Sequence, residues 1–301
     1  MSWQARLLCA ALRTFEKPKL ARAADPYAAR RGFERSARLF FRAPRGTTQR
    51  WVQLGSHHVL EVAGPWVTRQ SAVFYVHGGA YIMGSPKTHA AMLACLSQRT
   101  GMRILMPQYP LAPEAPFPAA FDAICDAYTA FTAEKADIVL GGDSAGGGLA
   151  FALLAHVLRH NLRVPVGVFG FSPFMDLTFS GGTILSNAGR DPLLPADRAK
   201  DIAGYYLDGA DPKDHRASPL FANWSDAPPI WLTVDETEIL RDDTLRFHAT
   251  LKSLGCPVVL HKTSGLPHVW PMFQNYLPEA RDTLDTLSDW ITRLLAETGE
   301  S

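Results

Sequence analysis

A serine flanked by small residues lies at 142–146, where the sequence reads Gly-Asp-Ser-Ala-Gly. An apolar run ends near Leu140 just before it, and a helical pattern extends from it to about His160. A tight turn from a strand into a helix strains the backbone of a serine at its apex and leaves no room for side chains two positions away. Ser144 is therefore predicted to be a nucleophile for acyl transfer. The alternatives are an ordinary glycine-rich turn between a strand and a helix, or a phosphate loop. No Gly-Lys-Ser/Thr follows, and the G-x-G-x-x-G spacing is absent.

Hydrogen-bond donors for an oxyanion are predicted in the stretch His-Gly-Gly-Ala at 77–80, after an apolar run that begins near Ser71. Acyl transfer places negative charge on a carbonyl oxygen, and preorganised N–H groups stabilise that charge. Consecutive glycines can turn their N–H groups inward, so Gly78 and Gly79 are two expected donors. Ala145, directly after the nucleophile, is the third. On its own, His-Gly-Gly can also be an ordinary turn.

A general base is predicted on the loop that follows the last strand-like run. When a serine of this kind precedes its acid and its base in the chain, the base lies on such a loop. His268 satisfies this order, because it follows the run at 257–263 and has Val269 and Trp270 to pack beneath it. A lone histidine is more often structural, and the other nine histidines fit this position less well.

Alternating strand-like and helix-like segments position these residues. The strand-like runs are 71–79, 102–108, 136–143, 165–172, 229–235 and 257–263, and the helix-like runs lie near 85–100, 116–133, 144–160, 242–254 and 277–297. Near-continuous apolar strands separated by helices predict an α/β fold with a mostly parallel sheet covered on both faces. Two regions break the alternation. Residues 1–45 are helical and basic, and 174–226 is an insertion long enough to fold over something.

Length and composition allow one large domain, since 301 residues with 47% hydrophobic content can bury a sizeable core. The balance of 30 basic and 29 acidic side chains gives no net field for nucleic acid or an anionic membrane, so a small neutral partner is expected. The four cysteines lack C-x-x-C spacing and are typical of buried thiols in a reducing compartment. They are Cys9, Cys95, Cys125 and Cys256.

The N-terminus is predicted to be an amphipathic helix rather than a signal peptide. Arg6 and Arg13 bracket an apolar run of six residues, and no small-residue cleavage site follows. One face of this helix would hold Trp3, Leu7, Leu8, Ala11, Leu12 and Phe15. The sequence contains no apolar run of about 18 residues, so no membrane span is expected and the cytoplasm is the expected location.

The set of motifs resembles the hormone-sensitive-lipase-like family of α/β-hydrolases, the bacterial carboxylesterases often called family IV. The matching stretches, in family order and spacing over about residues 70–290, are HGGAYIMGS, YPLAPEAPFPAAFDA, GGDSAGGGLA, FSPFMDL, ASPLFA and PHVWPMF. The resemblance implies the α/β-hydrolase fold with a helical cap built from residues 1–45 and the insertion at 174–226. Residues 46–301 would form the catalytic domain. Ala80 departs from the family, which often has a third glycine there, and Gln-Tyr-Pro at 108–110 replaces its Asp-Tyr-Arg.

The resemblance assigns Glu238 as the triad acid. The family's Asp-Pro-Leu occurs literally at Asp191, but that copy precedes the strand-like run at 229–235, whereas the acid should follow it. Aligning the motif after this run puts Glu238 in the acid's place. The acid must reach a ring nitrogen of His268 from a partly buried loop, and Ile239 and Leu240 can anchor that loop.

The other carboxylates of 234–243 have structural interpretations. Asp242 and Asp243 open a helical pattern and are expected to cap it. Asp235 and Glu236 lie at the end of a strand, where partial exposure or local hydrogen bonds are expected. Asp242 and then Asp235 remain the alternatives for the acid.

The resemblance implies a serine carboxylesterase for short- to medium-chain esters, with Ser144, Glu238 and His268 as its triad and an acyl-enzyme intermediate. No cofactor or metal is expected, and the expected partner is a small-molecule ester. An amidase or peptidase on the same triad remains an alternative. A ligand-binding protein on a hydrolase fold is another, although the intact Ser144 and His268 argue against it. The oligomeric state is left open, with a homodimer among the alternatives.

Overall fold

The computed structural model describes residues 1–23, 25–133 and 136–299. Within them, eight strands form one sheet in the order β1-β2-β4-β3-β5-β6-β7-β8. The strands are β1 Thr48–Leu54, β2 His57–Ala63, β3 Ala72–Val76, β4 Arg103–Pro107, β5 Ile138–Asp143, β6 Gly167–Phe171, β7 Ile230–Asp235 and β8 Val258–Thr263. Strands β3 to β8 pair in parallel, which confirms the six predicted strands, and β2 pairs antiparallel with β1 and β4.

The hairpin of β1 and β2 lies outside the sequence prediction. Leu54 pairs with His57, and the turn between them uses Gly55 at a φ of +57°, which glycine adopts without strain. Most β1 side chains are exposed, so the strand lacks the apolar alternation that reveals a half-buried strand. His57 and His58 therefore belong to the sheet.

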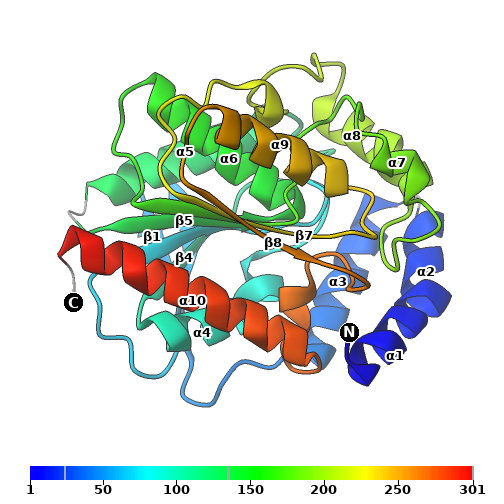
Figure 1. Cartoon of the computed structure of the whole chain (residues 1–301), viewed down its shortest axis with the longest axis horizontal. Coiled ribbons are helices and arrows are strands. Elements are labelled where there is room, and N and C mark those ends of the chain that lie inside the picture. The colour runs from blue at the N-terminus through cyan, green and yellow to red at the C-terminus, as the bar shows by residue number, and fades with distance from the viewer. Residues whose placement is uncertain (24, 134–135, 300–301) are drawn as a thin grey trace.

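Helices cover both faces of the sheet (Figure 1). One face carries α5 Ala119–Thr132, α6 Ser144–Arg159 and α9 Arg241–Ser253, and the other carries α4 Pro86–Thr100 and α10 Pro278–Thr298. Successive strand residues point to opposite faces, so Phe74 and Leu232 pack in one apolar core and Tyr75 and Trp231 in the other. The predicted α/β-hydrolase architecture is confirmed. Among the helices of the described residues, none combines the length and apolar character that crossing a bilayer requires.

The two irregular regions lie together at one end of the molecule, on the right in Figure 1. The N-terminal region holds α1 Trp3–Ala11, a π-helical turn Leu12–Glu16, α2 Lys17–Arg22 and α3 Pro26–Phe40, and the insertion holds α7 Thr183–Ser186 and α8 Ala199–Leu207. Lys17 Nζ donates to the carbonyl oxygens of Ala188 at 2.6 Å and Asp191 at 2.8 Å. Arg13 donates to that of Arg190 at 2.8 Å. The N-terminal helices are thus fastened to the insertion.

Candidate active site

Ser144 lies at the turn between β5 and α6 with a φ of +50°, a left-handed conformation that strains a residue with a side chain. A Cβ on Gly142 would lie 2.5 Å from the carbonyl oxygen of Gly146, and a Cβ on Gly146 would lie 2.2 Å from that of His77. No side chain fits at either position. The predicted need for glycine on both sides of Ser144 is confirmed, and Ser144 itself is partly exposed.

His268 and Glu238 meet although 30 residues separate them. His268 lies after β8 and Glu238 after β7, and Nδ1 of the ring contacts Oε2 of the carboxylate. The carboxylate is fully buried, and its Oε1 accepts the Ser172 hydroxyl at 2.7 Å and the Asp235 N–H at 2.8 Å. The sequence-predicted acid and base are therefore neighbours in the structure.

The other ring nitrogen of His268 is available for chemistry. Burial opposes a charged imidazole, but the Glu238 carboxylate beside the ring holds the pKa of His268 above its usual value. A ring that donates from Nδ1 to a carboxylate keeps a lone pair on Nε2. This Nε2 is buried and has no hydrogen-bond partner in the described part of the chain, which includes Ser144. Contacts between a catalytic serine and its base often tighten only when substrate binds.

Asp235, an alternative for the acid, holds the loop that leads to His268. Its carboxylate is fully buried and accepts the Thr263 hydroxyl at 2.9 Å and the N–H groups of Gly265 at 3.1 Å and Leu266 at 2.8 Å. Asp235 Oδ1 also accepts the N–H of Thr237 at 2.9 Å. Of the two expected alternatives, partial exposure or local hydrogen bonds, Asp235 therefore shows the second, and the donors together satisfy a buried charge.

Asp242 and Asp243 do not cap α9. The helix begins at Arg241 after Leu240, and its N-cap has no side-chain hydrogen bond. Asp242 and Asp243 follow as the second and third residues of the helix. Their predicted capping role is therefore wrong, although both remain structural residues near the positive end of the helix dipole.

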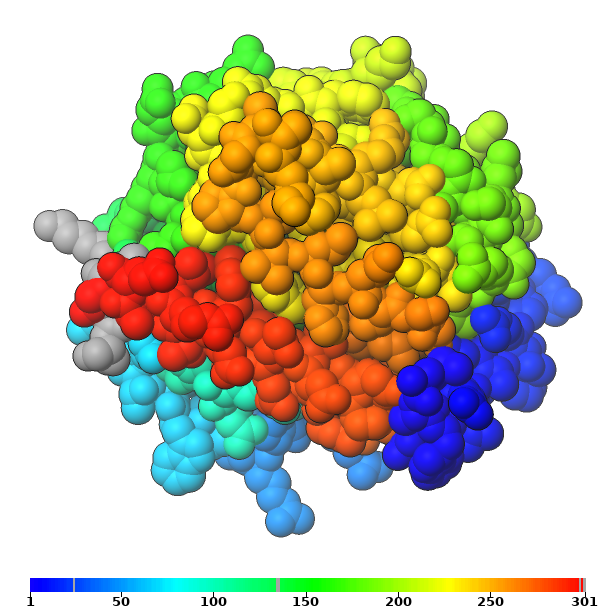
Figure 2. Space-filling view, viewed as in Figure 1, coloured from blue at the N-terminus to red at the C-terminus, as the bar shows by residue number. Residues whose placement is uncertain are grey.

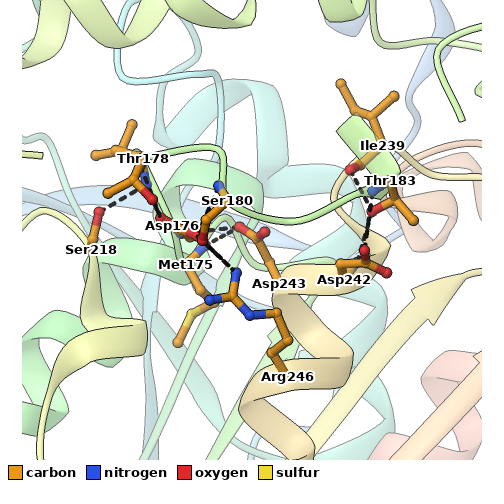
Figure 3. A network of polar contacts seen from close by, with 11 residues as sticks. Met175, Asp176, Thr178, Ser180, Thr183, Ser218, Ile239, Asp242, Asp243 and Arg246 are labelled. Atoms are coloured by element: carbon orange, nitrogen blue, oxygen red, sulfur yellow. Dashed lines mark hydrogen bonds and ion pairs between the residues drawn. The ribbon is translucent and has the colours of Figure 1, made fainter. Parts of the chain in front are cut away.

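Both aspartates instead reach the insertion (Figure 3). Asp242 Oδ2 accepts the N–H of Thr183 at 3.1 Å. Asp243 Oδ2 accepts the N–H groups of Met175 at 2.9 Å and Asp176 at 3.0 Å. These contacts fix the first part of the insertion to the helix that follows the Glu238 loop.

Asp191 is the first residue of the Asp-Pro-Leu stretch in the insertion. It is far from Glu238 in the sequence, but its side chain contacts the loop that carries Glu238. Its buried Oδ2 accepts the N–H of Ile239 at 3.0 Å. Asn187 Nδ2 donates to the carbonyl oxygens of Glu236 at 2.9 Å and Glu238 at 2.8 Å. The insertion therefore holds the backbone on both sides of Glu238. This placement agrees with the prediction that Asp191 is not the acid. The contact between Asp191 and Ile239 could not be predicted, because the two residues lie 48 positions apart in the sequence.

The predicted oxyanion donors need one correction. The N–H of Gly78 donates to Asp143 Oδ1 at 2.9 Å, so Gly78 is wrong as a free donor. The N–H groups of Gly79, Ala80 and Ala145 have no acceptor within the described residues. Gly79 at a φ of +127° and Ala80 at +55° make the turn that follows β3. Ala80, a residue that the sequence prediction passed over, thus joins Gly79 and Ala145 as a candidate donor.

Asp143 is the centre of a buried polar network beside the elbow. Besides Gly78, it accepts the Tyr75 hydroxyl at 2.8 Å and contacts His89 Nε2 at 3.3 Å. Burial alone would raise the pKa of Asp143, but His89, Tyr75 and Gly78 hold that pKa below its usual value. The charged carboxylate ties the turn after β3 to the residue before Ser144. An acidic residue inside Gly-Asp-Ser-Ala-Gly is the sequence signal for this role.

The structure was also searched for metal-binding groups and reactive thiols. In residues 1–23, 25–133 and 136–299, no group of three or more His, Cys, Asp or Glu side chains is arranged to hold a metal ion. The four cysteines are free and buried, which confirms the predicted buried thiols. Burial raises the pKa of Cys9 to about 11 and that of Cys125 to about 12, so both are protonated at neutral pH.

Known proteins are similar to this chain over most of its length. Residues 73–272 match the family described as alpha/beta hydrolase fold. An esterase of Acinetobacter venetianus is 34% identical over 296 residues, which cover 96% of this chain and 94% of the relative. An acetyl-hydrolase of Streptomyces hygroscopicus is 31% identical over 228 residues, 75% of this chain and 76% of the relative.

Solved structures are similar as well. The esterase EstE5, soaked with p-nitrophenyl butyrate, has a TM-score of 0.92 at 30% identity and covers 98% of this chain and 100% of its own. An esterase from the bacterial hormone-sensitive lipase family has a TM-score of 0.91 at 29% identity, and the match covers 98% of this chain and 99% of that esterase. The similarity therefore includes the N-terminal helices and the insertion.

Proposed function

Because this chain belongs to the hormone-sensitive-lipase-like family of α/β-hydrolases and is a carboxylic-ester hydrolase, we propose that Ser144, His268 and Glu238 are its catalytic triad. The observation that carries the proposal is the buried contact between Glu238 and His268 Nδ1, which leaves Nε2 without a partner among the described residues. The strained turn at Ser144 supports its role as the nucleophile.

In the proposed mechanism, Ser144 attacks the ester carbonyl while Nε2 of His268 accepts the hydroxyl proton. The N–H groups of Gly79, Ala80 and Ala145 stabilise the oxyanion of the tetrahedral intermediate. Glu238 stabilises the imidazolium, which then protonates the leaving alcohol. The product of this half-reaction is an ester of Ser144. Water repeats the sequence on that ester and releases the carboxylic acid.

We infer that the acyl group is short to medium in length. Tyr81, next to Ala80, stacks on Tyr206 of α8 with ring centroids 3.8 Å apart, and both rings are buried. Phe174, whose N–H donates to the Ser144 carbonyl oxygen at 2.9 Å, lies 6.2 Å from the Tyr81 ring centre. Three packed aromatic rings beside the elbow restrict the room for a long chain. The relative named acetyl-hydrolase agrees with this inference.

The N-terminal region and the insertion are proposed to act together as the cap over this site. Their side-chain contacts support this division into a cap and a catalytic domain. The contacts of Asp191 and Asn187 with the Glu238 loop support a second role, since the insertion also braces the triad acid.

A chain-length panel of p-nitrophenyl esters from acetate to laurate tests the proposal. The value of kcat/KM should peak among the short and medium esters and fall steeply by laurate, and Ser144→Ala should abolish turnover. A maximum at laurate would contradict the proposed acyl site. The amidase alternative is tested with the p-nitroanilide of the same carboxylic acid as the best ester substrate. Equal rates for the ester and the anilide would favour an amidase.

A further inference from the structure

The near-zero net charge of the chain conceals an uneven distribution. Residues 1–45 hold 11 of the 30 basic side chains and three of the 29 acidic ones, so the rest of the chain is net negative. Surface charges act over about 8 Å at physiological ionic strength, so a local excess matters more than the total. The expectation of no attraction to anionic surfaces, drawn from the total charge, therefore does not apply to this region.

The same region exposes large apolar side chains. Their exposed fractions are 68% for Trp3, 62% for Leu7, 71% for Phe15, 62% for Leu39 and 55% for Phe40. The fully buried residues of α1 are small, Ala5 and Cys9, and Leu8 packs beside them while partly buried. The predicted apolar face of the N-terminal helix thus points largely to solvent. Apolar patches of this kind mark interaction surfaces.

The start of α1 and the end of α3 both contact the chain around the start of α10. Ser2 Oγ donates to Glu279 Oε2 at 2.9 Å, and the Tyr276 hydroxyl donates to the Phe40 carbonyl oxygen at 2.8 Å. Tyr276 and Glu279 are three residues apart, which sets a limit of about 11 Å between their backbones. Figure 2 shows the first residues, dark blue, as a raised lobe beside the orange start of α10. We call this surface the N-terminal corner, and its residues are Trp3, Arg35, Arg38, Leu39 and Phe40.

A groove between α3 and α4 borders the N-terminal corner. It has a volume of about 790 Å³ and is lined by Arg35, Arg38 and Lys87, by one acid, Glu34, and by apolar residues that include Phe41. No salt bridge engages the three cations within the described residues. Unpaired cations above apolar side chains fit an anionic head group that carries acyl chains.

A second copy of this chain fits the N-terminal corner poorly. A twofold contact would bring the same cations against each other, and like charges across an interface are repulsive. An anionic bilayer complements both features, because aromatic and aliphatic side chains enter the head-group region while arginine and lysine bind phosphates. We propose that the N-terminal corner binds the surface of an anionic lipid bilayer. This binding is separate from the proposed triad.

Vesicle sedimentation of the full chain tests the proposal. The probes are vesicles of phosphatidylcholine alone and vesicles with about 30% phosphatidylglycerol, each at about 0.05 M and about 0.5 M salt. The protein should bind the anionic vesicles at low salt. Binding should be at least about tenfold weaker to neutral vesicles, and also at high salt, since a large part of the attraction is electrostatic.

Two double variants separate the apolar and the basic contributions. Trp3→Ser with Phe40→Ser, and Arg35→Gln with Arg38→Gln, should each weaken binding to anionic vesicles by about tenfold or more. These residues are not among the proposed catalytic groups, but they belong to the proposed cap, so ester hydrolysis is not used as the control for folding. The far-ultraviolet circular dichroism and the midpoint of thermal unfolding of each double variant should instead equal those of the wild type. These two measurements do not depend on the triad.

Trp66→Ser is the matched control. Trp66 is 81% exposed and lies near Gly101, at the opposite end of α4 from Lys87, about 20 Å along the helix. Its loss should leave vesicle binding unchanged. A loss equal to that of the Trp3 and Phe40 variant would overturn the proposal.

Three further results would overturn it. The first is equal binding to neutral and anionic vesicles, and the second is wild-type binding by both double variants. The third comes from sedimentation velocity without lipid. If Trp3→Ser with Phe40→Ser converts a dimer into a monomer while vesicle binding stays at the wild-type level, the N-terminal corner is an interface between copies.

Discussion

Glu238 uses one carboxylate for three contacts, with the ring of His268, the hydroxyl of Ser172 and the N–H of Asp235. A carboxylate can stay buried only when its oxygens are paired in this way. The same contacts hold the imidazole in one orientation and one tautomer. At the scale of single residues, removal of this charge should therefore change the chemistry more than the fold.

Replacing Glu238 with glutamine should lower kcat by about 10³- to 10⁴-fold while the protein stays folded, as expected when a triad loses its acid. The pKa of His268 should also fall, because Glu238 is what raises it. A base loses activity when the pH drops through its pKa, so the acidic limb of the kcat/KM profile should move to lower pH. Profiles of the wild type and Glu238→Gln measure both effects.

Asp242→Asn is the control for this prediction, since Asp242 lies four residues from Glu238 and contacts Thr183 instead of His268. Its pH profile should follow that of the wild type. Loss of turnover in folded Asp242→Asn, with turnover retained in Glu238→Gln, would reverse the assignment of the acid.

Ser144, His268 and Glu238 could be selected from the sequence because motif order and chain order restrict each of them. Gly78 could not be excluded in the same way. Whether its N–H is free depends on Asp143, a residue 65 positions away that accepts that N–H only in the folded chain. Ala80 was passed over because the conformation that frees its N–H belongs to the folded turn.

At the scale of elements, α9 connects the proposed triad acid to the insertion. The helix starts just after the Glu238 loop, and its second and third residues hold the backbone at Thr183, Met175 and Asp176. The sequence reveals a helix start with two aspartates but not their partners, which lie more than 50 positions earlier in the chain. A capping role was the local expectation, and long-range contacts replaced it.

Asp243 should make stability depend on pH. Burial raises the pKa of Asp243 to about 7, with Asp176 adding to the rise and Arg246 opposing it. Because this pKa is higher than in the unfolded chain, the folded state binds more protons between roughly pH 4 and 7, and its stability falls as pH rises through that window. Asp243→Asn keeps an acceptor and removes the titration. The free energy of unfolding, measured with urea from pH 5 to 8, should fall less steeply with pH in Asp243→Asn than in the wild type. The two slopes should differ by at most about 1.4 kcal/mol per pH unit.

The neighbouring Asp242→Asn variant is the control for the stability measurement, because the Asp242 side chain is partly exposed. Its slope should match the wild type. The account of Asp243 fails if the wild type and Asp243→Asn lose stability in parallel over the same pH range.

The predictability of the elements depended on their burial. Five of the parallel strands, β3 to β7, have apolar runs because helices cover both of their faces. The sixth, β8, is an edge strand and only partly buried, but its run of apolar residues also predicts a strand. The hairpin of β1 and β2 was missed because β1 is mostly exposed and mixes polar and apolar residues without alternation. The helices at 1–45 were predicted, but their apolar residues were not expected to face solvent.

At the scale of the whole molecule, residues far apart in sequence gather at two places. The loops after β3, β5, β7 and β8 carry the proposed catalytic groups, and the N-terminal helices with the insertion lie together at one end. The total charge does not reveal that the N-terminal region is basic, because the excess of acidic residues in the rest of the chain cancels it. The cytoplasmic location stays a prediction, and a homodimer stays one alternative for the oligomeric state.

The central claim is an acyl-enzyme on Ser144 that His268 and Glu238 activate. Its most direct test is rapid mixing with p-nitrophenyl butyrate, acid quench and peptide mass spectrometry. The account predicts a butyryl group on the peptide that contains Ser144, formed far more slowly in Glu238→Gln and absent in Ser144→Ala. Full turnover by Ser144→Ala, or a butyryl group on another residue during wild-type turnover, would contradict it.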